Sequence, residues 1–237
     1  MGKQKIKLVR ARHDDNCYKS TGNKKATITL NTVELKVKHI YPSDVVKLRL
    51  LDDIAKNKSI FLPFRNWELH ELPALRKTQR DIWTVKTMSE RARYVIVFFM
   101  IDRKDNFAKD CTYFDNLDIT DVKLYLNAEV YPYENMNLNF KNRLFTEAYR
   151  MYTEFQKAYL SKQFSEPLLS FTEFSSRCLF VIDCSKQNEA LKSNAIDVKL
   201  EFQSSKNFPD NSRAFCIIIH DRVIEYQALT GQVRDLL

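Results

Sequence analysis

The feature that most constrains the fold is a series of short runs in which apolar and polar side chains alternate. Between residues 33 and 38, the apolar Val33, Leu35 and Val37 each precede a charged residue. An alternation with a period of two is typical of a β-strand with one buried and one solvated face. The other runs of strand type are 60–64, 82–85, 94–102, 122–131, 179–183, 196–202, 214–220 and 223–226. The sequence therefore predicts a mainly β protein built of antiparallel sheets.

Two segments instead carry apolar residues at helical spacing. Segment 43–57 begins with the capping residue Ser43, and segment 140–160 has a long aromatic and aliphatic stripe without Pro or Gly. We interpret this stripe as a face that docks on a core. One short and one long helix are too few for alternating strand–helix units, so we expect helical insertions in a β domain.

Glycine is scarce, with three residues in 237, about 1% against a usual ~7%. Walker A loops and dinucleotide-binding turns need clustered glycines so that backbone N–H groups can approach phosphate, and the scarcity excludes both. Turns must then be formed by Asn and Asp, which tolerate a left-handed backbone. The clearest turn candidates are segments 207–211 and 220–222.

The net charge of +8 is concentrated at the start of the chain, where residues 1–25 contain eight basic and two acidic residues. A basic arm can bind phosphate backbones by counterion release without reading a base sequence. The candidate residues for such nucleic-acid contact are Lys3, Lys5, Lys7, Arg10, Arg12, Lys24 and Lys25. The alternative is a solvated terminus without a partner, since only Tyr18 lies among them to stack on bases.

The cysteines are five in number and form no CxxC pair. With no secretory signal at the start of the chain, this pattern indicates free thiols in a reducing compartment. The longest apolar run, 94–101, is far shorter than the ~20 residues needed to span a bilayer. We therefore expect a protein that is neither secreted nor embedded in a membrane.

Residues that commonly carry catalysis or bind metals form no constellation. The four histidines lack metal-ligand spacing, and His220-Asp221 is the only neighbouring His–carboxylate pair. Cys216 precedes His220 by about 13 Å along a strand, which is too far to activate the thiol. The acidic stretch 102–121 interleaves basic residues and indicates a solvated loop rather than a calcium site. The sequence predicts no catalytic, cofactor or metal residue, and no enzyme.

A series of distinctive motifs follows the chain from about residue 33 to residue 237. They are FRNWEL at 64–69, WTVKT at 83–87, RYVIVF at 93–98, FD at 114–115, VKLYLN at 122–127, YPYENMNL at 131–138, VID at 181–183, QNE at 187–189, DVKLE at 197–201, HDRVIEY at 220–226 and LTG at 229–231. In order and content this series resembles the double jelly roll-like domain proteins of animal genomes. Those proteins are similar to the major capsid proteins of polinton (Maverick) elements and their viral relatives.

The resemblance implies an antiparallel jelly-roll sandwich with a structural, non-catalytic role in a capsid. Relatives pack two eight-stranded rolls side by side and assemble as trimers, which implies a homo-oligomer in a virion or inside the cell. Because 237 residues are too few for two complete rolls, we expect a basic arm at 1–32 and a jelly-roll-type domain at 33–237. Residues 33–90 would then be the remnant of a first roll and residues 91–237 the C-terminal roll. A partly missing roll would leave unpaired strand edges.

A second hypothesis is a binding module on a single jelly roll, such as a lectin-like protein or a domesticated adaptor. A concave aromatic patch that includes Trp67, Trp83 or Tyr131 would favour it, whereas aromatic residues buried in a core would not. The two hypotheses differ in assembly. A capsid-like protein should form trimers or larger shells, and a binding module should stay monomeric and bind carbohydrate or peptide.

Overall fold

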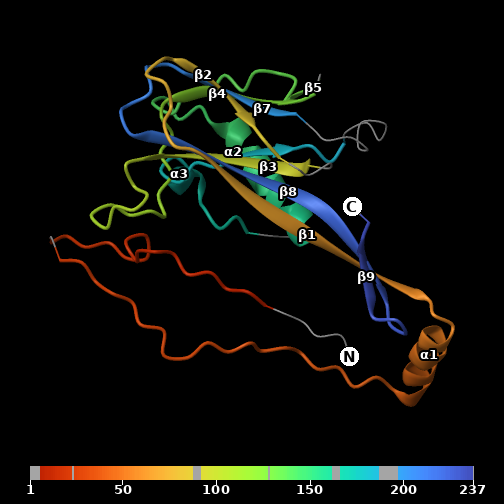
Figure 1. Ribbon diagram of the computed structural model, residues 1–237. Helices are drawn as coiled ribbons and strands as arrows, with labels where there is room; N and C mark the ends of the chain where they lie inside the picture. Colours follow the sequence, from red (N-terminus) through yellow and green to blue (C-terminus); the bar gives the residue numbers. More distant parts are fainter. Residues whose placement is uncertain are drawn as a thin grey trace. The chain divides into compact units, whose positions relative to one another are not determined.

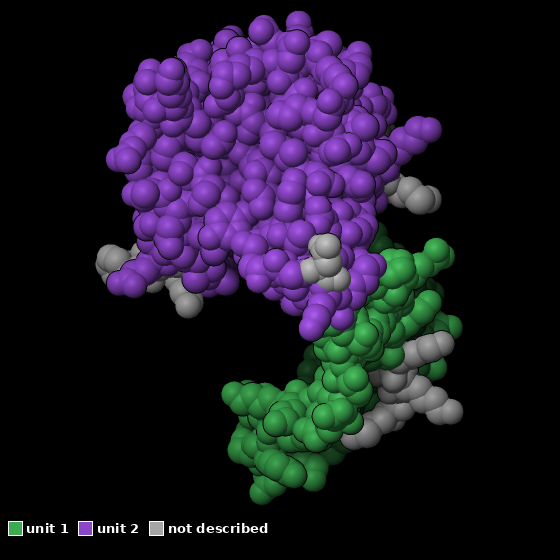
Figure 2. All heavy atoms as spheres, turned by 90° about the vertical axis from the view of Figure 1, so that its left-hand side faces the viewer, with its two compact units in different colours: residues 1–14, 26–65, 221–237 green, residues 15–25, 66–220 purple. Residues whose placement is uncertain are grey.

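The computed structural model describes residues 6–22, 24–87, 92–127, 129–161, 166–186 and 197–236. The chain divides into two compact units, which Figure 2 colours separately. Unit 1 consists of residues 1–14, 26–65 and 221–237, and unit 2 consists of residues 15–25 and 66–220. All residues of the main hydrophobic core lie in unit 2.

The strands form two sheets whose members interleave along the chain (Figure 1). The first sheet has the order β1 (Ser59–Leu72), β8 (Ser212–Gln227), β3 (Ala92–Ile101) and β6 (Phe180–Asp183), and β9 (Gln232–Asp235) also pairs with β8. The second sheet has the order β2 (Arg80–Val85), β7 (Val198–Ser204), β4 (Ile119–Leu126) and β5 (Glu129–Tyr131). Every pairing of known register is antiparallel. Strands β1 to β8, divided in this way between two sheets, form a jelly roll. The predicted mainly β, antiparallel jelly-roll sandwich is therefore confirmed.

The alternating side chains place the core between the two sheets. Val122 and Leu124 of β4 are fully buried, as their alternation with polar residues predicts. At the centre, the ring of Phe99 on β3 meets the ring of Phe202 on β7 edge to face, with 5.1 Å between centroids and an interplanar angle of 88°. Phe99 also contacts Phe180 of β6 at 5.9 Å. Phe99 thus joins both sheets through one side chain.

Within the described residues, three helices accompany the strands, namely α1 (Asp44–Ala55), α2 (Thr146–Leu160) and the single turn α3 (Phe171–Phe174). The first two correspond to the predicted helices at 43–57 and 140–160. The second begins later than predicted because Asn139 and Leu144 close a turn with two backbone hydrogen bonds of 2.8 Å. Within this turn Arg143 has a φ of +58°, which no right-handed helix can accommodate.

Helix α2 docks through its aromatic stripe, as predicted. It packs on β6, and its Phe155 meets Tyr94 of β3 with ring centroids 5.0 Å apart. On the same strand, Phe98 contacts Phe114 of the following loop at 4.6 Å. The helix and the loop thereby bury the side chains of β3 that do not face the second sheet. This explains the unbroken apolar run of that strand.

Several local predictions need correction. Residues 33–38 form no strand, because they pair with no other segment in the described part of the chain, and a lone strand leaves its backbone groups unpaired. Segment 220–222 is not a turn, because β8 continues through it and His220 stands opposite Ala92 of β3. The predicted strand 122–131 divides into β4 and β5 at Asn127. Ile196, in the predicted strand 196–202, lies outside the described residues.

Asn and Asp form most of the left-handed turns, as the scarcity of glycine predicts. Ten non-glycine residues of the described chain have a positive φ, and seven of these are Asn or Asp. Asn127 joins β4 to β5, and Asn211 lies in the turn before β8, which confirms the predicted turn at 207–211. Gly231, with a φ of +70°, lies between β8 and β9.

The predicted domain boundary at residue 90 falls between two strands of one jelly roll. Strands β1 and β2 come from segment 33–90, and strands β3 to β8 come from segment 91–237. The arm at 1–32 is shared between the units, because residues 15–25 belong to unit 2. The origin of segment 33–90 as the remnant of a first roll stays a prediction.

Candidate functional site

Unit 1 carries a run of exposed apolar side chains, which we call the apolar arm. It covers segment 33–51 and the first half of β1. Its exposed members are Val33, Leu35, Val37, Ile40, Tyr41, Val45, Val46, Leu48, Leu50, Leu51, Ile60, Phe61, Leu62 and Phe64. Helix α1, which lies within the arm, buries none of its residues. Large exposed apolar surfaces are rare on monomeric proteins and mark sites of interaction.

Strand β1 adds a backbone feature to the apolar arm, because it stands at one end of the strand order in the first sheet. Within unit 1, the Ser59 hydroxyl is hydrogen-bonded to Glu225, and Nε of Arg65 lies 3.5 Å from a carboxylate oxygen of Asp221. Residues on both faces of its first half are exposed, from Ile60 to Phe64. An exposed apolar edge strand is a template for pairing with another chain.

The basic residues predicted to contact nucleic acid are divided between the two units. Lys3 and Lys5 lie outside the described residues, and Lys7 and Arg12 are exposed in unit 1. Lys24 is exposed in unit 2. Their contact with nucleic acid stays a prediction.

The other two basic candidates are engaged within the chain. Nη2 of Arg10 lies 2.8 Å from the Asp14 carboxylate, and its hydrogen bond lowers the pKa of that carboxyl group. Nζ of Lys25 lies 3.6 Å from Asp15 and 5.7 Å from the ring centroid of Phe107. Both cations are therefore already partly neutralised by neighbouring groups.

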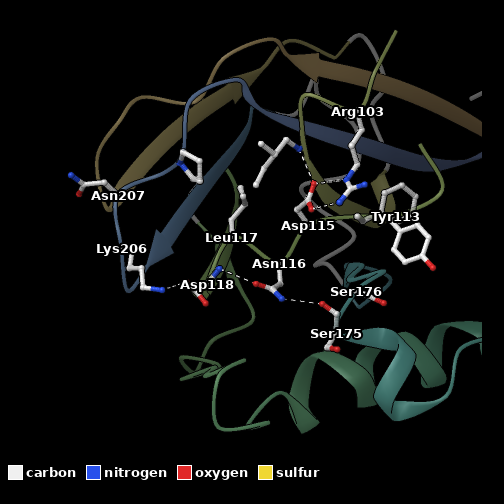
Figure 3. A pocket seen from close by; sticks show the side chains of 13 residues that line it. Arg103, Tyr113, Asp115, Asn116, Leu117, Asp118, Ser175, Ser176, Lys206 and Asn207 are labelled. Atoms are coloured by element: carbon white, nitrogen blue, oxygen red, sulfur yellow. Dashed lines mark hydrogen bonds and ion pairs between the residues drawn. The ribbon is translucent and has the colours of Figure 1, made fainter. Parts of the chain in front are cut away.

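A groove of about 500 Å³ opens in unit 2 among the β3–β4 loop, the end of α3 and the β7–β8 loop (Figure 3). Arg103 and Asp115 lie at one end, and Lys206 and Asp118 lie at the other. Each of these two cations is paired, since a guanidinium nitrogen of Arg103 is 2.7 Å from Asp115 and Nζ of Lys206 is 2.7 Å from Asp118. The remaining polar lining groups are hydroxyls and amides, which suit a small neutral ligand better than an ion.

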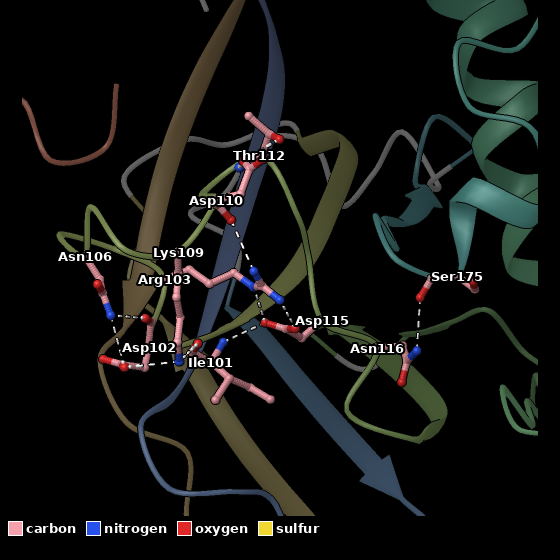
Figure 4. A network of polar contacts seen from close by, with 10 residues as sticks. All are labelled: Ile101, Asp102, Arg103, Asn106, Lys109, Asp110, Thr112, Asp115, Asn116 and Ser175. Atoms are coloured by element: carbon pink, nitrogen blue, oxygen red, sulfur yellow. Dashed lines mark hydrogen bonds and ion pairs between the residues drawn. The ribbon is translucent and has the colours of Figure 1, made fainter. Parts of the chain in front are cut away.

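The β3–β4 loop, residues 102–118, is held by a polar network around Asp115 (Figure 4). Oδ2 of Asp115 accepts hydrogen bonds from the Ile101 N–H and from Nε of Arg103, both at 2.8 Å. Arg103 also donates to the main-chain oxygen of Asp110 at 3.2 Å. Two hydrogen bonds from Thr112 lower the pKa of the Asp110 carboxyl. A two-pronged Arg–carboxylate pair is among the stronger polar contacts, so this loop is well fixed.

A partly buried His–carboxylate cluster, which the sequence did not predict, joins β1 to β8 in unit 2, and His220 is its fully buried member. One oxygen of Glu68 lies 3.1 Å from Nε2 of His70, and the other lies 3.2 Å from Nε2 of His220. The Thr87 hydroxyl donates to Glu68 at 3.0 Å. The predicted strand 60–64 ended before them, but β1 extends to Leu72 and places Glu68 and His70, two residues apart, on one face. The pairing of β1 with β8, which adds His220, has no local signal.

A second charged cluster links β1, β8 and the β3–β4 loop. Glu71 accepts a hydrogen bond from Arg213 at 2.8 Å and another from Nζ of Lys104. Partial burial acts to raise the pKa of Glu71, but the two cationic donors outweigh burial and lower it overall. The ionised form of Glu71 therefore stabilises the folded state.

This cluster predicts a pH dependence that Glu71→Gln should reduce. Because the folded pKa lies below the unfolded value of about 4.3, the stabilisation is present above that pH. It is lost as the pH falls through the folded pKa. Between neutral pH and mild acid, the melting temperature of the native protein should fall about 2–4 °C further than that of Glu71→Gln. Thermal denaturation followed by circular dichroism measures this difference.

Glu134→Gln, at an exposed position, is the control, and its melting temperature should depend on pH like that of the native protein. If Glu71→Gln were as sensitive to acid as the native protein, the prediction would be contradicted.

The cysteines divide into two groups. Cys178, Cys184 and Cys216 are buried, and burial raises the pKa of each thiol. Cys17 is exposed and Cys111 is partly exposed. Because the thiolate is the nucleophilic form, a buried and protonated Cys216 suits a structural role.

The three aromatic residues that would favour a binding module do not gather in one patch. Trp67, on β1 of the first sheet, is 48% exposed and donates a 2.9 Å hydrogen bond to the hydroxyl of Tyr159. Trp83 is buried on β2, and Tyr131 is half-buried on β5. Strands β2 and β5 are the two opposite edges of the second sheet.

Across the described ranges, no group of three or more His, Cys, Asp or Glu residues is arranged to hold a metal ion. The carboxylates of the acidic loop instead face cations such as Arg103, Lys109 and Lys206. None of the helices in the part of the chain that the structure describes combines the length and apolar character needed to cross a membrane.

Together these features define a jelly-roll domain that carries an exposed apolar arm, a fold used by viral capsid and lectin domains. A family model of the double jelly roll-like domain matches residues 1–224, and the chain belongs to this family. The match begins at residue 1, so the resemblance that we expected from about residue 33 also includes the basic arm. Fold and family together support a capsid-like structural role.

Comparison with solved structures finds a chain in a cryo-EM structure of the Sputnik virophage. Its TM-score is 0.45 and its sequence identity is 7%, and the alignment covers 75% of the present chain and 39% of the virophage chain. The present chain thus spans about two fifths of the length of that neighbour. No curated protein matches the sequence.

Proposed function

We propose that this protein is a non-catalytic, capsid-like building block that self-associates through its apolar arm. The observation that carries the proposal is the exposure of so many large apolar side chains in unit 1, from Val33 to Phe64. Full burial of a Leu, Ile or Phe side chain is more favourable than its exposure to water by about 1.5–3 kcal/mol. A second copy of the chain could recover that free energy at an interface.

The edge position of β1 supports the same conclusion. A jelly-roll building block must pack beside its neighbours, and an apolar edge strand can extend a sheet into the next copy. Membership of the double jelly roll-like domain family favours a homo-oligomer of this kind, a trimer or a larger shell, in a virion or inside the cell. The chain spans only 39% of the length of its virophage neighbour. That it assembles as a whole capsid protein does is therefore our proposal.

The oligomeric state of the full chain tests the proposal. Sedimentation velocity over a wide range of concentrations should show a concentration-dependent trimer or larger species. The variant Leu62→Asp/Phe64→Asp places two charges on one face of β1 within the apolar arm. We expect it to raise the apparent dissociation constant at least about 30-fold, as loss of an interface hot spot does.

The matched control is Leu144→Asp/Leu168→Asp, which alters two exposed side chains of unit 2. It should assemble like the native chain. A native chain that stays monomeric at every concentration would contradict the proposal, and monomers with affinity for carbohydrate or peptide would favour the binding module. Equal loss of assembly in both variants would assign the effect to net charge rather than to the arm.

A further inference from the structure

Residues 15–25 form a short segment of unit 2 that docks on the β3–β4 loop. The Asn16 side chain makes two hydrogen bonds with Asp105, at 2.8 Å and 2.6 Å, across 89 residues of sequence. The Ser20 N–H donates to the main-chain oxygen of Phe107 at 2.8 Å. The rings of Tyr18 and Phe107 stack with centroids 6.3 Å apart. Polar and aromatic contacts therefore fix the two segments side by side.

Two cysteines meet at this contact. Sγ of Cys111 donates a 2.8 Å hydrogen bond to the main-chain oxygen of Asn16. Peptide geometry places that oxygen about 2.8 Å from the Cα of the next residue, Cys17, so the Cys111 sulfur lies within about 5.6 Å of that Cα. The Cα of Cys111 lies a further ~2.8 Å from its own sulfur, so the two Cα atoms lie within about 8.4 Å of each other, and a disulfide joins Cα atoms roughly 4.4–6.8 Å apart. Closure therefore needs side-chain rotation and a shift of the exposed segment that brings the two Cα atoms into this range.

The loop that carries Cys111 is held in place from its other side. Asp115 and Arg103 form the network of Figure 4, and the Asp110 carboxylate, next to Cys111, accepts two hydrogen bonds from Thr112. The position of the Cys111 sulfur is therefore set by the fold as well as by segment 15–25. A fixed thiol beside an exposed one has a high effective concentration toward it.

Exposure separates this pair from the other cysteines. Cys17 is exposed and Cys111 is partly exposed, whereas Cys178, Cys184 and Cys216 are buried. Reaction with a dissolved oxidant requires access to the sulfur. All five cysteines lie in the described residues, so this comparison of exposure includes every thiol of the chain.

We propose that Cys17 and Cys111 are an oxidisable dithiol, a modification site that closes into an intramolecular disulfide when a small-molecule disulfide is present. The bond would fasten segment 15–25 covalently to the β3–β4 loop. In a reducing compartment the pair stays reduced, and it closes when the surroundings become oxidising.

The chemistry is two thiol–disulfide exchanges. The Cys17 thiolate attacks one sulfur of the small disulfide, so that a mixed disulfide forms and one small thiolate leaves. Cys111 then loses its proton to water and attacks the Cys17 sulfur, which releases the second small thiolate. The two protons lost by the protein thiols are regained by the two released thiolates. Two protein thiols are thus oxidised by two electrons, and the small disulfide is reduced to two thiols. Burial raises the pKa of Cys111, and the charge of Asp110 adds to the rise, so the second step should accelerate with pH.

Peptide mapping of the full chain tests this site. The reduced protein is freed of reductant, incubated with oxidised glutathione and alkylated, and its peptides are analysed without reduction by mass spectrometry. We expect the Cys17–Cys111 peptide to be the main cross-link. Its ratio to the glutathione mixed disulfides should be at least about tenfold higher in the folded chain than in urea, because folding replaces a long, flexible separation by contact.

Variants of the chain distinguish a specific Cys17–Cys111 pair from general reactivity of the thiols. Cys111→Ser should accumulate the mixed disulfide on Cys17. Asn16→Ala should lower the cross-link ratio several-fold, because it removes both bonds to Asp105, whereas the exposed-site control Asn142→Ala should leave it unchanged. A folded chain that carries glutathione on both cysteines without the cross-link would overturn the proposal. So would an equal ratio in urea, or a cross-link to a buried cysteine.

Discussion

Phe99→Ala is expected to lower the free energy of unfolding by about 3–5 kcal/mol, the range for removing a buried phenylalanine ring. Phe99 is fully buried on β3 and contacts Phe180 and Phe202, which lie in different sheets. The substitution therefore opens a cavity where the two sheets meet. Equilibrium unfolding in urea, followed by circular dichroism, measures the loss.

Tyr133→Ala is the matched aromatic control, because that side chain is almost fully exposed. It should change the free energy of unfolding by no more than about 0.5 kcal/mol. If Phe99→Ala does not fold, Phe99→Leu should still show a smaller loss in the same direction. A Phe99→Ala variant as stable as Tyr133→Ala would show that the two sheets do not depend on this contact.

Lys123→Met is expected to lower the free energy of unfolding by about 3–5 kcal/mol, the range for removing one partner of a buried ion pair. Lys123 is 7% exposed, and Nζ donates to the main-chain oxygens of Pro132, Tyr133 and Glu134 at 3.0, 3.3 and 2.6 Å. The buried Asp121 carboxylate lies 3.9 Å away. Methionine keeps the length of the side chain, but it leaves the Asp121 carboxylate without its cationic partner and the three carbonyls without the Lys123 donor. Urea unfolding measures the loss.

Two further variants define the origin of that loss. Lys141→Met, at an exposed position, should be nearly neutral. In Asp121→Asn/Lys123→Met the buried negative charge is also removed, so part of the lost stability should return. A double variant that is less stable than the sum of its single changes would show that charge compensation is not the cause.

The alternation of side chains predicted the strands well, because it reports which face of a strand is buried. Val122 and Leu124 of β4 are buried as expected, although Lys123 between them is buried as well. It could not predict which strands pair, since β2 and β7 are more than one hundred residues apart and their register depends on the whole fold. The same limit explains the error at Val33, where a local strand pattern has no neighbour in the described chain.

Sequence reasoning also missed features that depend on distant segments. His220 was assigned to a turn because His-Asp-Arg resembles turn composition, yet β8 continues through it and brings it to Glu68. The groove gathers residues from three separate parts of the chain, with no motif in any one of them. Cys17 and Cys111 are likewise far apart in sequence, and only the docking of segment 15–25 makes them neighbours.

The use of Asn and Asp at left-handed turns also affects the denatured ensemble. Glycine explores more backbone conformations than any other residue, so a chain with few glycines has less disorder to lose when it folds. Each turn such as Asn127 or Asn211 accepts a small steric cost in the native state in exchange for a more restricted unfolded chain. Part of the stability of this domain therefore comes from the lower conformational entropy of its unfolded chain. A list of the contacts in the native structure would not show this contribution.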